Sequence, residues 1–392
     1  MPEHSRDTSM PSSHSEDLSQ SGQAAPSAKS ESSRSHRRII IACCIIVIAA
    51  LAIGAYAFAS MQQTPTNTSE EPAAESAEPD DSDASLDATS SEAATTTPAP
   101  AATPAPAKAV TQPQYVAIFG DDSWEKYTPG HSDLMMLMRV DFEHHQLTLV
   151  TVPRDTRYHT ADGTTCKANE VFRLGGADAA CKAVSDITGI AVTQYVTIGF
   201  DGLQAIVRDL DGTVQMNLPY ALSYDFYTRD YPDEYFEAGL QDVSPWRAMA
   251  LSRARTGYEQ YDLSQDMMRE TVNRQMFTRL AQSALTGQTS PALLTSLIGS
   301  VLTNIPVQTI LSWAQELEEG SSLTVYGTSG PFEGDVDAAS QLWLVNDNPA
   351  GWKQLMSVVD AGQDPSTVTG LWDPAAESPI APIATKTVIP LS

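Results

Sequence analysis

The sequence has few basic residues and lacks the common metal and nucleotide motifs. Its 392 residues include 23 Lys and Arg against 49 Asp and Glu, a net charge of −26 at pH 7. Non-specific binding to nucleic acid needs a cationic surface, which this balance argues against. The four Cys and seven His form neither CxxC nor HExxH, so their spacing predicts no zinc site. GxxxxGKS/T and GxSxG are also missing, which disfavours a P-loop NTPase and an α/β-hydrolase.

The N-terminal region divides into a polar segment and an apolar one. Residues 1–38 are serine-rich, carry five acids and five bases, and show no apolar periodicity. They would bury too little surface to offset the entropy of ordering, so we predict a disordered tail. Residues 39–59 are an uncharged apolar run of 21 residues. As a helix this run would be about 30 Å long, which is one hydrocarbon core.

Basic residues flank this run on one side only. Arg34, Arg37 and Arg38 precede it, and the next basic residue is Lys108. The positive-inside rule then predicts a single-pass protein in the cell membrane, with a cytoplasmic N-terminus and an extracellular remainder. A cleaved signal peptide is the alternative, because residues 57–59 resemble an AxA cleavage site.

Residues 60–112 have the composition of a linker. They are rich in Thr, Pro, Ala and Ser, and nine acids lie between Glu70 and Glu92. Proline and repelling charge favour an extended tether between the membrane and the next domain.

Residues 113–363 are predicted to form a layered α/β domain. Strand patterns occur at 115–119, 146–152 and 194–200, mixed with helical patterns. Residues 364–392 include a Pro-rich stretch from Ala375 and are predicted to be a loose tail. The predicted helices span 177–188, 202–210, 245–253, 265–284, 291–302, 307–318 and 349–361.

Arginine is concentrated in one part of this domain. Twelve arginines lie between Arg139 and Arg279, whereas residues 280–352 contain no Lys or Arg. In an acidic domain this distribution suggests a local anion site, because a guanidinium donates two parallel hydrogen bonds to a phosphate. Surface ion pairs on helices are the alternative.

Short strings of acids and arginines follow the first two predicted strands, and two more lie in the region of the predicted helices 245–253 and 265–284. Acids and arginines at the ends of adjacent strands can converge at one edge of a sheet, a common ligand position in α/β folds. Two carboxylates brought together there would repel unless a cation lay between them, and Mg²⁺ with a diphosphate is the simplest such arrangement. The strings are Gly120-Asp121-Asp122, Gly130-His131-Ser132-Asp133, Pro153-Arg154-Asp155-Thr156, Leu251-Ser252-Arg253-Ala254-Arg255 and Asp266-Met267-Met268-Arg269.

In this order, the strings resemble the LytR-CpsA-Psr family of envelope proteins, over roughly 115–361. Lys167-Ala168-Asn169, Gly175-Gly176 and the 195–200 strand also match the family pattern. The resemblance implies a mixed central sheet flanked by helices, with an apolar groove for a prenyl chain. It also implies an extracellular transferase that moves a glycopolymer from undecaprenyl diphosphate to peptidoglycan, forming a phosphodiester with Mg²⁺.

The family pattern assigns roles to individual residues. Asp122 and Asp133 would hold Mg²⁺, and four arginines would clamp the phosphates. Asp155 would orient an arginine and Asp266 would fix Arg269, and either carboxylate is a candidate base for the acceptor hydroxyl. The clamp is Arg154, Arg253, Arg255 and Arg269, and the expected substrate-binding residues are His131, Lys167, Asn169, Asn273 and Gln275.

Departures from the pattern leave other functions open. His131 stands where the family has Arg, Trp124 replaces another Arg, and Arg274-Gln275 lies two residues beyond the family's RQ pair. A prenyl-diphosphate-binding module and a diphosphate hydrolase are therefore the alternatives. A transcription regulator would need DNA contact on the cytoplasmic side, where only 38 polar residues without net charge are expected.

Two cysteines fall in the part predicted to be extracellular. Disulfides persist in that compartment, so Cys166 and Cys181 are a candidate pair. A bond would close a loop of about 15 residues and stabilise the fold by about 3 kcal/mol. Free thiols are the alternative.

Overall fold

The computed structural model describes residues 112–123, 130–224, 234–255, 258, 265–286, 296–297, 299–318, 320–371 and 384–391. The predicted tail, the apolar run, nearly all of the linker and Trp124 lie outside these ranges. Among the helices of the described ranges, none is long and apolar enough to cross a membrane.

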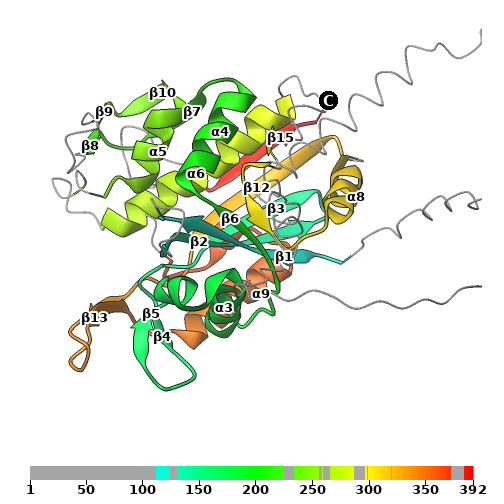
Figure 1. Ribbon diagram of the computed structural model, residues 1–392. Helices are drawn as coiled ribbons and strands as arrows, with labels where there is room; N and C mark the ends of the chain where they lie inside the picture. The colour runs from blue at the N-terminus through cyan, green and yellow to red at the C-terminus, as the bar shows by residue number, and fades with distance from the viewer. Residues whose placement is uncertain are drawn as a thin grey trace, which may run out of the picture.

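A seven-stranded mixed sheet forms the centre of the domain, as the predicted fold class requires (Figure 1). Antiparallel pairs join β1 to β2 and β2 to β3, while β1–β6 and β3–β12 are parallel. In spatial order the strands are β11 (Leu302–Thr303), β6 (Gln194–Ile198), β1 (Gln114–Asp121), β2 (Ser132–Asp141), β3 (Gln146–Thr151), β12 (Ser322–Ser329) and β15 (Lys386–Pro390).

Both faces of the central strands are buried, which explains their continuous apolar sequence. On β1, Val116 and Ile118 belong to one hydrophobic cluster, whereas Ala117 and Phe119 belong to another. This alternation follows from the two-residue period of a strand, and helices must cover both faces of such a sheet.

Two helical layers provide this cover (Figure 1). One contributes to the larger cluster and contains α4 (Phe200–Leu210), α5 (Pro245–Arg253), α6 (Gln265–Thr286) and α8 (Val307–Glu318). The other contains α3 (Glu170–Thr188) and α9 (Pro349–Asp360). Small antiparallel pairs complete the domain: β4 (Arg157–His159) with β5 (Thr165–Lys167), β7 (Val214–Leu218) with β10 (Gly239–Val243), β8 (Leu222–Tyr224) with β9 (Glu234–Phe236), and β13 (Gly334–Val336) with β14 (Trp343–Val345).

Most predicted helices are confirmed within a few residues, but α3 starts earlier than predicted. Its additional turn, 170–176, precedes a kink at Gly176, where φ is +70° and ψ is −167°. Glycine adopts this conformation readily because it has no Cβ. Of the helix predicted at 291–302, residues 296, 297 and 299 are helical, residues 291–295 and 298 lie outside the described ranges, and Leu302 belongs to β11.

The prediction of a loose tail after residue 363 is wrong for its last part. Residues 386–390 form β15, which pairs antiparallel with β12. Ile389 is fully buried and joins the larger hydrophobic cluster. Burial of this side chain and the added backbone hydrogen bonds hold a segment that looks unstructured by composition.

The predicted disulfide is not formed, and both cysteines are free and buried. Cys166 on β5 packs with Val171 and Ala183, whereas Cys181 on α3 faces the cluster beneath the central sheet. The two thiols thus lie in different apolar clusters. Burial raises the pKa of the Cys181 thiol to about 12, which keeps it protonated and unreactive.

Candidate functional site

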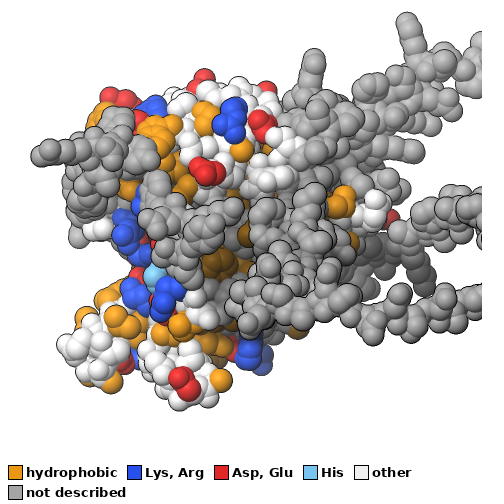
Figure 2. Space-filling view, in the orientation of Figure 1, with side chains coloured by type: hydrophobic (Ala, Val, Ile, Leu, Met, Phe, Trp, Pro, Cys, Tyr) orange, Lys and Arg blue, Asp and Glu red, His pale blue; other side chains and the backbone are white. Residues whose placement is uncertain are grey.

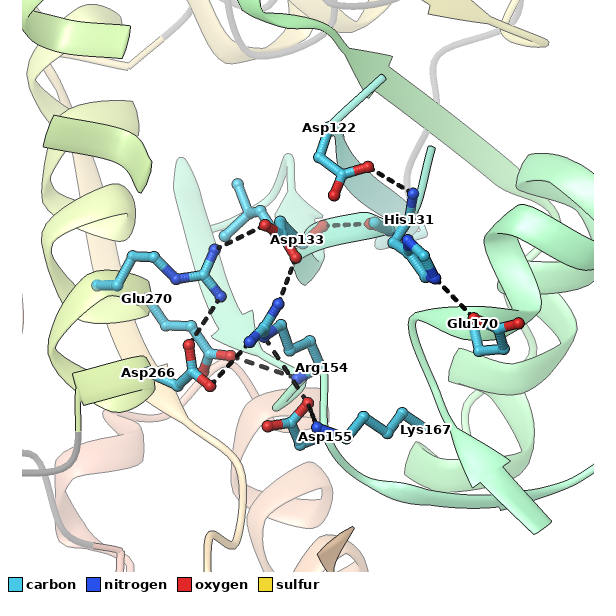
Figure 3. Close-up of polar contacts among 12 residues, drawn as sticks. Asp122, His131, Asp133, Arg154, Asp155, Lys167, Glu170, Asp266 and Glu270 are labelled. Carbon is cyan, nitrogen blue, oxygen red and sulfur yellow. Dashed lines mark hydrogen bonds and ion pairs between the residues drawn. The ribbon is translucent and has the colours of Figure 1, made fainter. Parts of the chain in front are cut away.

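Four charged side chains form a closed ring beside the start of β2 and the end of β3, in the middle of the sheet, and we call it the charge ring (Figure 3). Arg154 Nη1 lies 2.5 Å from Asp133 Oδ1, and its Nη2 lies 3.1 Å from Asp266 Oδ2. Arg269 Nη2 lies 3.3 Å from Asp266 Oδ1, and its Nη1 lies 3.9 Å from Asp133 Oδ2. Positive and negative groups therefore alternate around the ring.

Three elements supply the ring. Asp133 lies near the start of β2, Arg154 follows β3, and Asp266 and Arg269 occupy the first turns of α6. On α6 the two residues are three apart, a spacing that places them on one helix face. The convergence predicted from the strings after the strands is therefore present.

A tight turn fixes the segment that carries Arg154. The backbone N–H and hydroxyl of Thr156 both donate to the Pro153 carbonyl, at 3.0 and 2.6 Å. The Asn169 N–H donates to the Arg154 carbonyl at 3.1 Å. These bonds fix the backbone from which the Arg154 side chain extends into the ring.

Burial and charge set the protonation of the ring. Burial raises the pKa of Asp133 and Asp266, but Arg269 and Arg154 outweigh it and hold both pKa values below their usual range. The Arg269 side chain is 1% exposed, and its Nε has no hydrogen-bond partner. The ring therefore presents buried, permanently charged guanidinium groups with unused donors, which suits a phosphate.

Two further contacts extend the ring toward solvent. Lys167 Nζ lies 2.9 Å from Asp155 Oδ1, which is also 3.7 Å from Arg154 Nε. At the rim, His131 Nε2 lies 2.6 Å from Glu170 Oε2, and Glu170 also pairs with Arg173. We call these last three residues the rim cluster.

Glu270 is a site residue that sequence reasoning missed. It is fully buried, one oxygen accepts the Arg154 N–H at 3.3 Å, and the other has no partner (Figure 3). Burial raises its pKa to about 8, against the opposing effect of Arg269, so it is mostly protonated at pH 7. It directly follows Arg269, but nothing in its local sequence distinguishes it from an exposed helical acid.

A polar cleft and an apolar pocket meet at this site. The cleft has a volume of about 440 Å³ and the pocket about 50 Å³, and Asp133 lines both. The pocket extends between α4, α5 and α6 and includes Leu203, Met276 and Phe277. Figure 2 shows basic side chains and a histidine gathered where two lobes leave the body of the domain.

The structure brings together nearly all of the predicted site residues. Asn273 lines the pocket and donates from its side chain to the Ser252 carbonyl at 3.0 Å, and Arg253 lies over the Phe200 ring. The pocket is also lined by Arg269, and the cleft by Asp122, His131, Asp133, Arg154, Asp155, Lys167, Asn169 and Arg255.

Gln275 is the exception, because it lines neither cavity. Its side-chain amide exchanges two hydrogen bonds with the Asn217 backbone on β7, at 3.0 and 3.1 Å. Arg274 points elsewhere too, donating to the hydroxyls of Thr151 and Ser329 at 2.8 and 2.9 Å. The displaced Arg-Gln pair joins α6 to strands instead of facing the cleft.

A divalent cation fits one part of the cleft. No group of three or more His, Cys, Asp or Glu arranged for a metal occurs in the described ranges. Asp122 and Asp133 nevertheless line the same cleft, and burial followed by the Asp133 charge raises the pKa of Asp122. A cation between them would relieve this repulsion, and Mg²⁺ commonly takes one or two carboxylates together with substrate phosphates and water.

Comparison with known proteins identifies the same family that the sequence strings resemble. The model of the LytR_cpsA_psr family matches residues 66–352. Among curated relatives, "Polyisoprenyl-teichoic acid--peptidoglycan teichoic acid transferase TagV" of Bacillus subtilis is 25% identical over 42% of this chain, and "Cell wall biosynthesis protein LcpA" of Corynebacterium glutamicum is 24% identical over 48%. The matches span 42% and 40% of these two relatives, less than half of their length.

A solved structure agrees on the fold. The crystal structure of Bacillus subtilis TagV matches with a TM-score of 0.52 and 18% identity, and the match covers 65% of this chain and 99% of that one. The family model spans well over half of the sequence, and the strings that resemble the family pattern lie on or beside strands of the mixed sheet and on α5 and α6. The chain therefore belongs to the LytR_cpsA_psr family.

Proposed function

We propose that this protein is a membrane-anchored phosphotransferase that moves a glycopolymer from an undecaprenyl diphosphate carrier to peptidoglycan. The observation that carries the proposal is the charge ring at the junction of the polar cleft and the apolar pocket. The printed name of the TagV relative, a polyisoprenyl-teichoic acid–peptidoglycan transferase, supports the same class of reaction. A single span at 39–59, with the catalytic domain outside the cell, completes the proposed arrangement.

The two cavities suit the two ends of such a donor. A prenyl chain is apolar, as are Leu203, Met276 and Phe277 in the pocket, and the pocket of about 50 Å³ would have to widen to admit the chain. The diphosphate would then lie at the pocket mouth, beside Arg253 and Arg269, with Arg154 across Asp133. Binding there exchanges aspartate oxygens for phosphate oxygens around guanidinium groups that are already positioned.

The reaction joins the acceptor to the phosphate next to the sugar. An acceptor hydroxyl oxygen attacks that phosphorus, a new P–O bond forms, and the bridging P–O bond of the diphosphate breaks. Prenyl monophosphate leaves, and the polymer keeps one phosphate as a phosphodiester. Negative charge builds up on the phosphate oxygens, where Arg154, Arg253, Arg255 and Arg269 stabilise it.

The acceptor proton needs a base within the cleft. Asp266 is a poor base because Arg154 and Arg269 lower its pKa, despite its burial. Asp155 lines the cleft beside Lys167, so we assign the proton to Asp155 and a positioning role to Asp266. His131, Lys167 and Asn169 line the same cleft and would contact the substrate, while Asn273 lines the mouth of the pocket.

Mg²⁺ held by Asp122 and Asp133 would neutralise part of the diphosphate charge and make prenyl monophosphate a better leaving group. The carboxylate oxygens and the raised pKa of Asp122, caused first by burial and then by Asp133, support this assignment.

The direct test uses the full-length chain in detergent micelles. The substrates are a prenyl diphosphate-linked, labelled sugar and a soluble peptidoglycan fragment, with Mg²⁺ or EDTA. We expect Mg²⁺-dependent release of prenyl monophosphate and label on the glycan, and loss of both in Asp133→Ala and Arg154→Ala. Arg247→Ala is the matched control, because Arg247 pairs with Glu234 and lines neither cavity.

Two other outcomes would contradict the proposal. Release without labelling of the glycan would indicate a diphosphate hydrolase. Tight, Asp133-dependent binding of the donor without turnover would indicate a binding module, with His131 in place of the family arginine as the first residue to change.

A further inference from the structure

One arginine at the mouth of the apolar pocket lies against aromatic rings. Arg253 Cζ is 4.8 Å from the centroid of the Phe200 ring and 5.8 Å from the centroid of the Tyr224 ring. Both distances are within about 6 Å, the range in which the face of a ring attracts a guanidinium. Two rings therefore contact a single cation beside the place proposed for the donor diphosphate.

The ends of three elements bring these side chains together. Phe200 is the first residue of α4, Arg253 is the last residue of α5, and Tyr224 is the last residue of β8. Helix α4 packs against α5, and α5 packs against β8. Tyr224 also packs against the larger hydrophobic cluster. The rings are thus anchored to the body of the domain whether or not a ligand is bound.

This contact differs in chemistry from the charge ring. In the charge ring, Asp133 and Asp266 occupy N–H groups of Arg154 and Arg269. The face of an aromatic ring attracts a guanidinium through its π electrons, so the contact uses no N–H donor. It also places no negative charge beside an incoming phosphate. Aromatic rings can therefore fix a guanidinium without competing with the phosphate for it.

The location of Arg253 makes such a contact useful for binding the donor. Arg253 and Phe200 line the pocket together with Asp133 and Arg269, which also belong to the charge ring. Arg253 thus lies where the pocket meets the charge ring. A long side chain loses rotamer freedom when it binds a phosphate, and earlier contact with two rings reduces that loss.

We propose that Phe200 and Tyr224 are positioning residues that hold Arg253 in place for the donor diphosphate. The inference rests on the proposed function for the identity of the donor, and it adds the two rings that preorganise one of its arginines. Phe200 also lines the pocket, so the test must separate an effect through Arg253 from direct contact with the prenyl chain.

The first experiment measures binding of geranyl diphosphate and Mg²⁺ to the full-length chain in nanodiscs, by isothermal titration calorimetry. We expect binding to be about tenfold weaker in Phe200→Leu, because a ring face is replaced by an aliphatic group of similar size. Tyr224→Leu should weaken binding by about threefold, since the Tyr224 ring lies farther from Arg253. Phe200→Tyr keeps the ring and should stay within about twofold of the wild type.

The chain offers a matched control for the loss of a ring. Arg247 Cζ lies 4.6 Å from the centroid of the Phe236 ring, and neither residue lines the pocket or the cleft. Phe236→Leu removes the same kind of contact and should leave binding of geranyl diphosphate unchanged. Circular dichroism checks that each variant is folded. An equal loss of binding in folded Phe236→Leu would indicate a general effect on the domain and overturn the inference.

A double-mutant cycle decides whether Phe200 acts through Arg253. When Arg253→Ala is already present, adding Phe200→Leu should change binding by less than about twofold. An equal loss in both backgrounds would assign Phe200 to direct contact with the prenyl chain and overturn the inference. Binding that Arg253→Ala leaves unchanged would also overturn it, because Arg253 would then not bind the donor.

Turnover separates this inference from the proposed function. In the transferase assay, Phe200→Leu should lower kcat/KM for the donor by about tenfold, while the acceptor KM stays within about twofold. If only the acceptor KM changed, the positioning role would be wrong and the transferase would stand. If the wild type transferred nothing but binding still depended on Phe200 through Arg253, the proposed transferase would fail while the positioning role stood.

Discussion

The charge ring and the rim cluster use the same chemistry at different depths. In the ring, the side chains of Arg269 and Arg154 are 1% and 11% exposed. In the rim cluster, those of His131 and Arg173 are both 41% exposed. The acids do not differ in this way, since Asp133 is 28% exposed and Glu170 is 25% exposed. Water screens the rim contacts, so each contributes little to stability, whereas each buried guanidinium in the ring depends on its partners. The contrast shows that ion-pair distance alone does not rank these residues.

Among substitutions in the two clusters, Arg269→Ala in the charge ring should have the largest effect on stability and turnover. Asp133 and Asp266 would then share Arg154 alone, and we expect a loss of about 3–5 kcal/mol in the free energy of unfolding. The turnover number should fall by about 10²–10³-fold, because a preorganised donor to the transition state is removed. Denaturant unfolding and donor turnover measure the two effects. Arg279→Ala on the same helix is the control, and equal losses in both variants would contradict a special role for the ring.

Asp266→Asn tests the ring from its acidic side. Because Arg269 and Arg154 hold the folded-state pKa of Asp266 below its usual value despite burial, its charge stabilises the fold above the unfolded pKa. This stabilisation is lost as the pH falls through the lower, folded-state pKa. We expect the variant to be about 2–3 kcal/mol less stable at pH 7, with the difference vanishing in acid. Urea unfolding from pH 3 to 7 measures the difference in the free energy of unfolding between the two proteins. A difference that does not depend on pH would contradict the prediction.

Glu270→Gln should show the opposite pH dependence. The folded-state pKa of Glu270 is raised to about 8 from a usual value near 4.5, so the folded state holds the extra proton between these values. Wild-type stability should therefore fall relative to the variant as the pH rises through this window, and stay lower above it. The variant should be about 2 kcal/mol more stable at pH 9 and nearly unchanged at pH 5. Parallel stability curves from pH 5 to 9 would show that Glu270 ionises normally.

The smallest effects are expected at the rim. Glu170→Gln removes the partner of His131 and Arg173, and should change stability by less than about 1 kcal/mol. His131→Arg restores the family residue and should lower the donor KM by about threefold at low salt, with less gain at high salt. Donor titrations at two ionic strengths measure this. A loss of stability in Glu170→Gln as large as that in Arg269→Ala would contradict the distinction between the charge ring and the rim cluster.

Part of the site was predictable from local sequence. The strings around Asp122, Asp133 and Arg154 follow or begin strands, so their convergence followed from sheet geometry. Asp266 and Arg269 are three apart on a helix, which predicts that they share a face, and the packing of α6 then brings that face to the strand ends. Glu270 was not predictable, because its raised pKa depends on burial by surrounding elements. The place of Leu342 was equally hidden, since it is 187 positions beyond Asp155 in the sequence and reaches the cleft only through the hairpin of β13 and β14.

Three predictions from the sequence were wrong because contacts between distant segments decided the outcome. Cys166 and Cys181 suggested a bond because they are a pair in the part predicted to be extracellular, but β5 and the kinked α3 place them in different clusters. Gln275 matched the glutamine of the family's RQ pair, but it lies two residues further along α6, and there its side chain points toward β7. Residues 386–390 looked unstructured, yet the exposed edge of β12 supplies the backbone partners that a short strand needs.

The sequence by itself determined the layered α/β class, most helices and the charged strings, because these depend on short-range periodicity and on residue type. Only the tertiary structure decided which charges are buried together, which cysteines are apart and where a distant hairpin meets the cleft. These depend on contacts between residues far apart in the chain, and burial then sets the pKa of each group by the neighbours that replace water. Acidic and basic side chains of similar chemistry thus form a buried ring in one place and a solvated rim in another, according to their packing.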